Sequence, residues 1–392
     1  MSQNLSYVLV TPYTIAKSRT GGVLARLLSQ TDLELVGAQI FTPNETFVKE
    51  YADSLRVRVP QDELKLIADY VEKNLTPTGN RPHRSLLLLF RGENPCQKLL
   101  AICGGIHTGN FEVDSNSAET IRETYADLIY SKDNRNTVSY FEPAVLTPRT
   151  QEDSNSDLLR FAHFLEGKEN IVKNMVYQDT SKIEQTLVII KPENWEHNSS
   201  RPGAIIDMFS RTGLRIVGIK VHRFTMAQAL DFYGPVEAVL KEKLAPSFGR
   251  QAKELLEREF NFPINEETEK LLSGSFGIDC AKNQFANIVE FMSGRRPGTC
   301  LPEDYQKPSE VKCMILVYEG ENAVKKIRDV LGPTDPLRAP EGTVRREFGR
   351  DIMINTAHAS DSRESYDREK VIVRTEENSL ARIIREQVTV SK

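Results

Sequence analysis

One histidine stands in a strongly polar stretch near the end of the chain. Residues 355–365 read NTAHASDSRES, and His358 is one of six histidines in 392 residues. An imidazole is largely neutral near pH 7 and is a good nucleophile, so this side chain could carry a group between two substrates. Arg345 lies a short way before it, and a guanidinium can hold an anionic substrate. Taken alone, His358 fits a surface residue in a polar turn as well as a nucleophile.

A hydrolase triad is a poor explanation for the same stretch. His358, Ser360 and Asp361 are close to contiguous in the sequence. The three members of a triad must meet end to end in space, which residues this close along one segment cannot readily do.

The elements that must position these residues occur twice in the chain. SYVLVTPYTIAKSRTGGVLARLLSQTDLELVGAQI (6–40) parallels TLVIIKPENWEHNSSRPGAIIDMFSRTGLRIVGIKV (186–221). Each copy reads as an apolar strand ending before proline, a polar loop, an amphipathic helix, a turn and a second strand ending in V-G. Gly213 suits the end of the second helix, where a left-handed residue is favoured.

The parallel resumes further along the chain. SLLLLFRGENPCQKLLAICG (85–104) matches KCMILVYEGENAVKKIRDVLG (312–332), and ETIRETYAD (119–127) matches GTVRREFGRD (342–351). Two strand–helix–strand–strand–helix–strand units therefore predict an α+β protein of two tandem ferredoxin-like sandwiches, each with an antiparallel sheet covered by helices. We place the domains at 1–170 and 182–392, with an insertion at 243–283 in the second.

Composition narrows the class of protein. A net charge of −4 and the lack of a dense Lys/Arg stripe give no reason to expect a nucleic-acid partner. The start shows no signal-peptide pattern, and no apolar stretch approaches the roughly 18–20 residues that a membrane span needs. Five cysteines without a C-x-x-C pair fit reduced thiols. These features predict a cytoplasmic protein.

Six motifs follow one another in the second repeat. They are TLVIIKP (186–192), FY (232–233), ANIVEFMSG (286–294), YEGENAVKKIRDVLGPTDP (318–336), APEGTVRREFG (339–349) and NTAHASDSRESYDRE (355–369). In this order they resemble the nucleoside diphosphate kinase family, and the first repeat looks like a diverged member. The resemblance implies that His358 takes the γ-phosphoryl group of a nucleoside triphosphate and passes it to a nucleoside diphosphate in a ping-pong cycle.

The resemblance also assigns the surrounding residues. Glu369 would orient the imidazole, with Ser360 as a bridge and Tyr233 close by, but the sequence leaves open which ring nitrogen Glu369 serves. Lys191 follows its strand directly, so its ammonium can emerge at the strand's end. The residues implied to hold the nucleotide are Lys191, Arg328, Thr334, Arg345 and Asn355. Two guanidiniums can grip phosphate oxygens bidentately.

No protein ligands for a metal are predicted. The sequence contains neither G-x-x-x-x-G-K-[ST] nor G-x-G-x-x-G, so phosphate binding is expected to rest on side chains. Mg²⁺ is expected to arrive with the nucleotide, because it prefers phosphate oxygens and water to a protein cage.

Three departures from the family pattern bear on activity. Ala359 stands where glycine normally follows the histidine, which would restrict φ if that position were strained. Gln284 occupies the position of a base-stacking phenylalanine, although Phe285 is adjacent. The insertion at 243–283 could be a lid, an interface or neither, and it could alter nucleotide specificity.

The first repeat is expected not to catalyse. Thr11 replaces the lysine, Leu100 replaces the first arginine, and the histidine position falls near Thr150, whereas Arg122 survives. A structural role follows, in which the first copy supplies one half of a family-type pair. Further homo-oligomer formation is expected through pairing of the kinase-like domains.

Two other functions stay open. The departures and the degenerate copy would also fit a nucleotide-sensing or scaffolding protein with vestigial turnover. A third possibility is transfer of the phosphoryl group from His358 to a protein.

Overall fold

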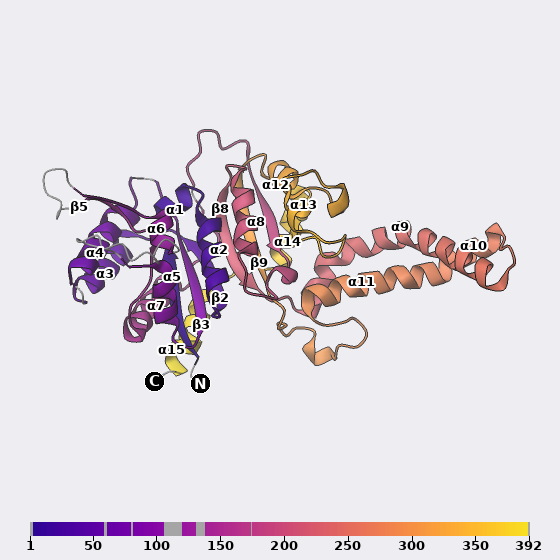
Figure 1. Cartoon of the computed structure of the whole chain (residues 1–392), viewed down its shortest axis with the longest axis horizontal. Coiled ribbons are helices and arrows are strands. Elements are labelled where there is room, and N and C mark those ends of the chain that lie inside the picture. Colours follow the sequence, from indigo (N-terminus) through magenta and orange to yellow (C-terminus); the bar gives the residue numbers. More distant parts are fainter. Residues whose placement is uncertain are drawn as a thin grey trace. The chain divides into compact units, whose positions relative to one another are not determined.

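A computed structural model describes residues 3–58, 61–79, 81–105, 120–130, 138–173 and 175–390 (Figure 1). The first half contains β1 (Asn4–Val10), α1 (Pro12–Ala16), α2 (Thr20–Gln30), β2 (Glu34–Phe41), α3 (Glu45–Arg56), α4 (Gln61–Leu75), β3 (Ser85–Gly92), α5 (Pro95–Cys103), α6 (Ile121–Tyr125), β4 (Asp127–Tyr130), β5 (Val138–Glu142), β6 (Val145–Leu146) and α7 (Gln151–Leu165).

The second half contains β7 (Ile183–Ile190), α8 (Arg201–Ser210), β8 (Arg215–His222), α9 (Met226–Phe260), α10 (Glu266–Leu272), α11 (Ile278–Ser293), β9 (Cys313–Glu321), α12 (Ala323–Leu331), α13 (Val344–Phe348), β10 (Ala357–Ala359), α14 (Arg363–Ile372) and α15 (Leu380–Val390). Short 3₁₀ turns lie at Pro192–Asn194, Pro302–Asp304 and Pro336–Arg338, and a π-helical turn lies at Ser273–Gly277.

Two four-stranded sheets confirm the α+β class. The first has the order β2-β3-β1-β6 and the second the order β10-β7-β9-β8, so each places its first and third strands in the middle. The pairs β1–β3, β1–β6, β2–β3, β7–β9 and β7–β10 are antiparallel. This is the strand order of the ferredoxin-like unit that the strand–helix pattern predicts. A separate two-stranded ribbon, β4–β5, was not predicted.

Local backbone geometry recurs at matched positions of the two halves. Asn94 and Asn322 precede α5 and α12 with φ of 50° and 55°. Gly104 and Gly332 follow the same helices with φ of 83° and 84°. Left-handed conformations are uncommon outside glycine, and here they begin and end α5 and α12 in the same way.

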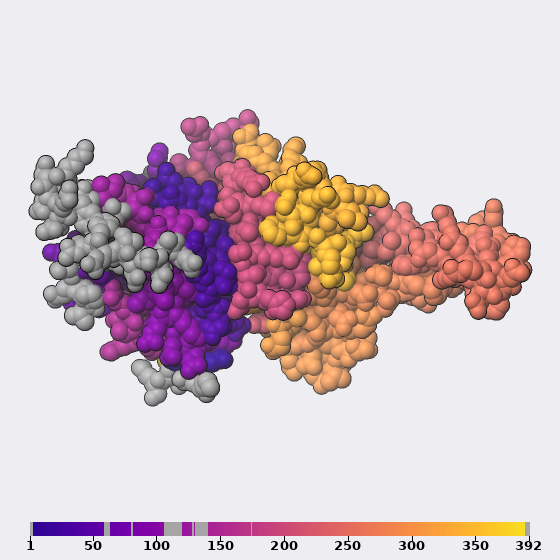
Figure 2. Space-filling view, viewed as in Figure 1, coloured from indigo at the N-terminus to yellow at the C-terminus, as the bar shows by residue number. Residues whose placement is uncertain are grey.

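Helix α2 of the first half and helix α8 of the second half pack closely against each other at glycines. A Cβ atom on Gly203 would lie 2.1 Å from the Ala25 backbone nitrogen, and one on Gly21 would lie 2.4 Å from the Asp207 nitrogen. Only residues without side chains allow the two backbones to approach this closely. In Figure 2 the indigo surface of the first half meets the rose surface around residue 200 directly.

The C-terminal helix completes the core of the first half. Leu380, Ile384 and Val388 of α15 are buried in the same apolar cluster as Phe47 and Phe161. α15 packs against α7, β1 and β2. The predicted domain of 182–392 therefore ends in a helix that packs within the first half.

Contact density divides the chain into two compact units. The first comprises Met1–Val221, Met314–Lys370 and Arg374–Lys392, and the second comprises His222–Cys313 and Val371–Val373. In the second unit α9 and α11 lie side by side (Figure 1). In the described part of the chain, no helix is both long enough and apolar enough to cross a bilayer.

Candidate active site

The predicted nucleophile lies on the shortest strand of the second sheet. β10 pairs with β7, and His358 stands opposite Ile189. Its side chain is 24% exposed, while Ala357 and Ala359 on either side are buried. Alternation along the strand therefore fixes the neighbours in the core and leaves the imidazole accessible.

Glu369 on α14 fixes the orientation of the imidazole. His358 Nε2 lies 3.0 Å from Glu369 Oε2, and Ser360 Oγ donates to the same oxygen at 2.8 Å. Because a carboxylate only accepts, Nε2 carries the hydrogen and the lone pair of the neutral ring lies on Nδ1. The structure thus places Glu369 on Nε2, a point that the sequence left open.

Backbone strain lies two residues before His358. Thr356 has φ 77°, which is unusual for a β-branched residue. Its N–H donates to Glu193 Oε1 at 2.8 Å, and its carbonyl accepts from the Lys191 N–H at 3.0 Å and from Asn194 Nδ2 at 2.8 Å. These contacts hold the strained turn, and sequence reasoning missed Glu193, Asn194 and Thr356.

Ala359 carries no such strain. Its φ is not in the left-handed region, and it pairs with Val188 as an ordinary strand residue. The methyl group that replaces the usual glycine hydrogen is therefore compatible with the backbone beside His358.

Lys191 and Asn355 are in direct contact. Lys191 Nζ donates to Asn355 Oδ1 at 2.7 Å and to the Met353 carbonyl at 2.9 Å. Burial lowers the pKa of the Lys191 ammonium to about 8, partly offset by the nearby Glu193. Burial also raises the pKa of the Glu193 carboxyl. The lysine charge is therefore costly to maintain without an anion beside it.

Arg345 on α13 links the end of α12 to β10. Its Nη1 donates to the Gly332 carbonyl at 2.9 Å and its Nη2 to the Ala357 carbonyl at 3.0 Å. The guanidinium is thereby held next to the residue that precedes His358. These two contacts are directional, so a lysine could not reproduce them.

The remaining predicted residues are less closely joined to this group. Arg328 on α12 and Thr334 beyond it are exposed, and the Thr334 carbonyl accepts from Asn355 Nδ2 at 3.1 Å. Tyr233 is buried on α9 in the second compact unit, with its ring centroid 5.0 Å from that of Phe232. Its placement near His358 stays a prediction. Gln284 is half-buried on α11, and Phe285 is buried in that unit.

Comparison with known proteins identifies the family. The family profile described as "Nucleoside diphosphate kinase" matches residues 184–244 and 272–378. The nucleoside diphosphate kinase of Anaeromyxobacter dehalogenans (strain 2CP-C) is 31% identical over 183 residues, covering 47% of this chain and 83% of that protein. The chain belongs to the nucleoside diphosphate kinase family. The Myxococcus xanthus nucleoside diphosphate kinase is 32% identical over 184 residues, covering 47% and 84%.

A solved structure of a nucleoside diphosphate kinase is also similar to part of this chain. The Aquifex aeolicus nucleoside diphosphate kinase is 27% identical and covers 49% of this chain and 94% of its own, with a TM-score of 0.30. The profile skips residues 245–271, which lie inside the predicted insertion at 243–283.

The first half carries a leucine at the position that corresponds to His358. Leu146 of β6 stands opposite Leu9 of β1, just as His358 of β10 stands opposite Ile189 of β7. Leu146 is the first residue of the stretch LTPRTQEDSNS, so the register puts the histidine position four residues before Thr150, the N-cap residue of α7. β6 has only two residues, which is too short to show its register in the sequence.

Other family positions in the first half follow the predicted replacements. Thr11 N–H donates to the Ala144 carbonyl at 3.1 Å, as Lys191 N–H does to Thr356. Gly104 N–H bonds the Leu100 carbonyl as Gly332 N–H bonds that of Arg328. Arg122 survives and, like Arg345, bonds two carbonyls, those of Gly104 and Val145.

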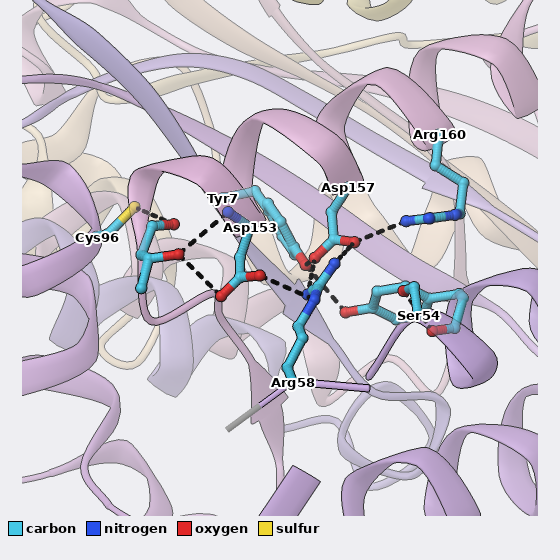
Figure 3. Close-up of polar contacts among 9 residues, drawn as sticks. Tyr7, Ser54, Arg58, Cys96, Asp153, Asp157 and Arg160 are labelled. Carbon is cyan, nitrogen blue, oxygen red and sulfur yellow. Dashed lines mark hydrogen bonds and ion pairs between the residues drawn. The ribbon is translucent and has the colours of Figure 1, made fainter. Parts of the chain in front are cut away.

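A saturated carboxylate occupies the position of Glu369 in the first half. Asp157 lies eleven residues after Leu146, the same interval as from His358 to Glu369. It is fully buried and accepts from Tyr7 Oη at 2.8 Å, from Arg58 at 2.7 and 2.8 Å and from Arg160 at 2.8 Å. Figure 3 shows Arg58 reaching both Asp157 and Asp153. The negative charge of Asp157 is thus balanced by the guanidiniums of Arg58 and Arg160 rather than by an imidazole.

Proposed function

We propose that the chain is a nucleoside diphosphate kinase that works through phospho-His358. The observation that carries the proposal is the hydrogen bond from His358 Nε2 to Glu369, which Ser360 reinforces. It leaves the imidazole lone pair on Nδ1, at an accessible side chain. Lys191 and Arg345 supply positive charge to the same stretch of backbone.

In the first half-reaction, Nδ1 of His358 attacks the γ-phosphorus of a nucleoside triphosphate. A bond from Nδ1 to phosphorus forms, the bond from phosphorus to the bridging oxygen breaks, and the nucleoside diphosphate leaves. The ring then bears positive charge, which the Glu369 carboxylate stabilises through Nε2. In the second half-reaction, a terminal phosphate oxygen of another nucleoside diphosphate attacks the same phosphorus and frees Nδ1.

The basic residues hold the nucleotide during both steps. Arg345, Arg328 and Thr334 would bind phosphate oxygens, and Lys191 would bind both phosphate and sugar hydroxyl groups. Asn355 would bind the ribose, and Tyr233 would lie near His358. A bound phosphate offsets the cost of burying the Lys191 ammonium, so substrate binding and lysine protonation favour each other.

Mg²⁺ belongs to the nucleotide substrate in this scheme. Within the described residues, no group of three His, Cys, Asp or Glu side chains could hold a metal ion. The ion would instead be bound by phosphate oxygens and water, where it neutralises part of their charge.

The first half has a structural role in this proposal. It carries Leu146 in place of a nucleophile, and its helix α2 packs closely against α8 of the catalytic half. We therefore interpret the chain as two tandem copies, one degenerate, joined as a pair. Assembly into larger homo-oligomers stays a prediction.

Steady-state kinetics test the proposal. With ATP and a second nucleoside diphosphate, the wild-type chain should show parallel double-reciprocal plots, and His358→Asn should abolish turnover. Ser362→Ala, two residues beyond Ser360, is a control that should retain activity. Tight nucleotide binding without turnover would contradict the proposal and favour the sensing or scaffolding alternative.

A further inference from the structure

A polar cavity away from His358 lies in the first compact unit. It has a volume of about 1080 Å³ and lies between the start of α1, the loop before β3, the segment that joins the two repeats and the neighbouring ends of β8 and β9. His358, Lys191, Arg345 and Asn355 are not among its lining residues. The volume is in the range of cavities that hold small organic ligands.

Five cations line this cavity, namely Arg81, Arg84, Lys182, Arg215 and Lys326. Arg84 Nη1 donates to the Ile216 carbonyl at 2.6 Å, and Arg215 Nη1 donates to the Val176 carbonyl at 2.8 Å. Both guanidiniums are thus anchored by neutral backbone groups. Among the described residues, none of the five cations lies within ion-pair distance of a carboxylate.

Carboxylates are present, but neutral donors engage most of them. Glu319 accepts from Tyr177 Oη at 2.8 Å and from Gln185 Nε2 at 2.7 Å. Glu142 accepts from Tyr70 Oη at 2.6 Å, and Asp179 accepts from the Ser181 hydroxyl. Glu321 is exposed. The acids therefore face hydroxyl and amide groups, while the cations keep their charge.

Arg84 and Arg215 lie close enough to repel each other. Burial and the neighbouring Arg215 charge together lower the pKa of Arg84 to about 10, while Tyr177 and Glu319 counteract the shift in part. Two neighbouring guanidiniums are a common way to bind phosphate, because their forked N–H groups match its oxygens. An anion between them would remove the repulsion.

We propose that this cavity binds an organic phosphate, with its phosphate groups on Arg84 and Arg215. Tyr13 and Tyr140, which also line the cavity, offer aromatic surface for the organic part. The site is separate from His358, so a ligand here would occupy the chain without being phosphorylated or dephosphorylated. The proposal does not rest on the kinase activity.

Calorimetric titration of the full chain with ADP tests this site. Wild type should bind two ADP molecules, one at each site, and Arg84→Gln/Arg215→Gln should weaken one of them by about tenfold or more. Arg250→Gln/Arg382→Gln is a matched control, since it removes the same charge from side chains that are 70% and 68% exposed. It should leave both binding events unchanged.

Further titrations distinguish the phosphate part of the ligand from its nucleoside part. Pyrophosphate should displace ADP from the cavity, whereas adenosine should not, because the charge recognition lies in the phosphates. Arg81→Gln/Lys326→Gln should also weaken ADP binding in the cavity. Because it changes different residues of the same cavity, it checks that the loss in Arg84→Gln/Arg215→Gln is not caused by misfolding. Conversely, Arg328→Gln should weaken only the event at the His358 site.

Failure of the cavity proposal and failure of the kinase proposal give different titration results. A single ADP site in wild type that Arg328→Gln abolishes, or two sites that persist in both cavity variants, would overturn the cavity proposal. A wild-type chain that binds ADP only in the cavity, in an event that Arg84→Gln/Arg215→Gln weakens and Arg328→Gln does not, would count against the kinase proposal and leave the cavity proposal standing.

Discussion

The carboxylate of Glu369 sets both the tautomer and the orientation of His358. Through Ser360 it is itself held by a second donor, and its side chain is only 5% exposed. A rigid, buried acceptor favours the ring with hydrogen on Nε2 in the resting state. In the proposed mechanism it would also stabilise the positive charge that develops on the ring when Nδ1 is phosphorylated.

Removing this acceptor should slow phosphoryl transfer with little effect on nucleotide binding. We expect Glu369→Ala to lower kcat on the order of 100-fold, because the ring loses its orientation and its stabilising charge. Glu364→Ala, at an exposed position of the same helix, should be close to wild type. Equal kcat values for the two variants would show that Glu369 does not support His358.

The buried ammonium of Lys191 predicts a pH dependence. Its pKa of about 8 means that the free enzyme loses this charge as the pH rises through that value. We expect kcat/KM for a nucleoside diphosphate to fall above about pH 8. Lys191→Arg keeps a charged group and should lack this step, even at reduced activity. A wild-type profile that is flat to pH 10 would contradict the assignment.

Residue types revealed only part of this site. Lys191, Arg345, Asn355, Ser360 and Glu369 were expected from the resemblance to the family, and the structure bonds Lys191 to Asn355 and Ser360 to Glu369. The contacts that hold the turn at Thr356 could not be predicted. Glu193 and Asn194 contact Thr356 although they lie more than 160 positions before it in the sequence. A threonine also gives no sequence signal that its φ will be left-handed. The only available signal was a polar pair directly after Lys191-Pro192.

At the scale of elements, the internal repeat predicted most strands and helices, and the identical strand order followed from it. It could not predict β4–β5, or the packing of α15 on the first half. Neither feature has a counterpart in the other repeat, so the comparison of copies gave no information about them. The contact between α2 and α8 was also invisible, although both helices carry the glycines that permit it.

That contact yields a stability prediction. Gly203→Ala places a methyl group against the α2 backbone, which cannot move aside as a flexible side chain can. We expect a loss of about 1–3 kcal/mol in the free energy of unfolding. Urea denaturation followed by circular dichroism measures it. Gly234→Ala has nothing within 4 Å of the added atom, and a stabilisation of up to about 1 kcal/mol is expected from helix propensity.

At the scale of the whole molecule, the two repeats are not separable pieces. α15 comes at the end of the chain but fills the core of the first half, and Asn378 Nδ2 on the way to it donates to the Leu165 carbonyl at 2.7 Å. A fragment comprising residues 182–392 would present the apolar face of α15 to water. The structure therefore favours experiments on the full chain.

The same packing makes a residue near the C-terminus important for the stability of the N-terminal half. Ile384 is fully buried, and Ile384→Ala should cost about 2–5 kcal/mol through lost burial and the cavity left behind. Arg382→Ala on the exposed side of α15 should stay within about 0.5 kcal/mol of wild type. Comparable urea midpoints for the two variants would mean that α15 does not pack as described.

The central claim is that His358 carries the phosphoryl group, and direct labelling tests it. The full chain is incubated with ATP labelled on the γ-phosphate and analysed before a nucleoside diphosphate is added. We predict an acid-labile, alkali-stable label on Nδ1 of His358, which is discharged by nucleoside diphosphate and missing from His358→Asn. A wild-type chain that stays unlabelled, or a His358→Asn chain that is labelled equally, would contradict it.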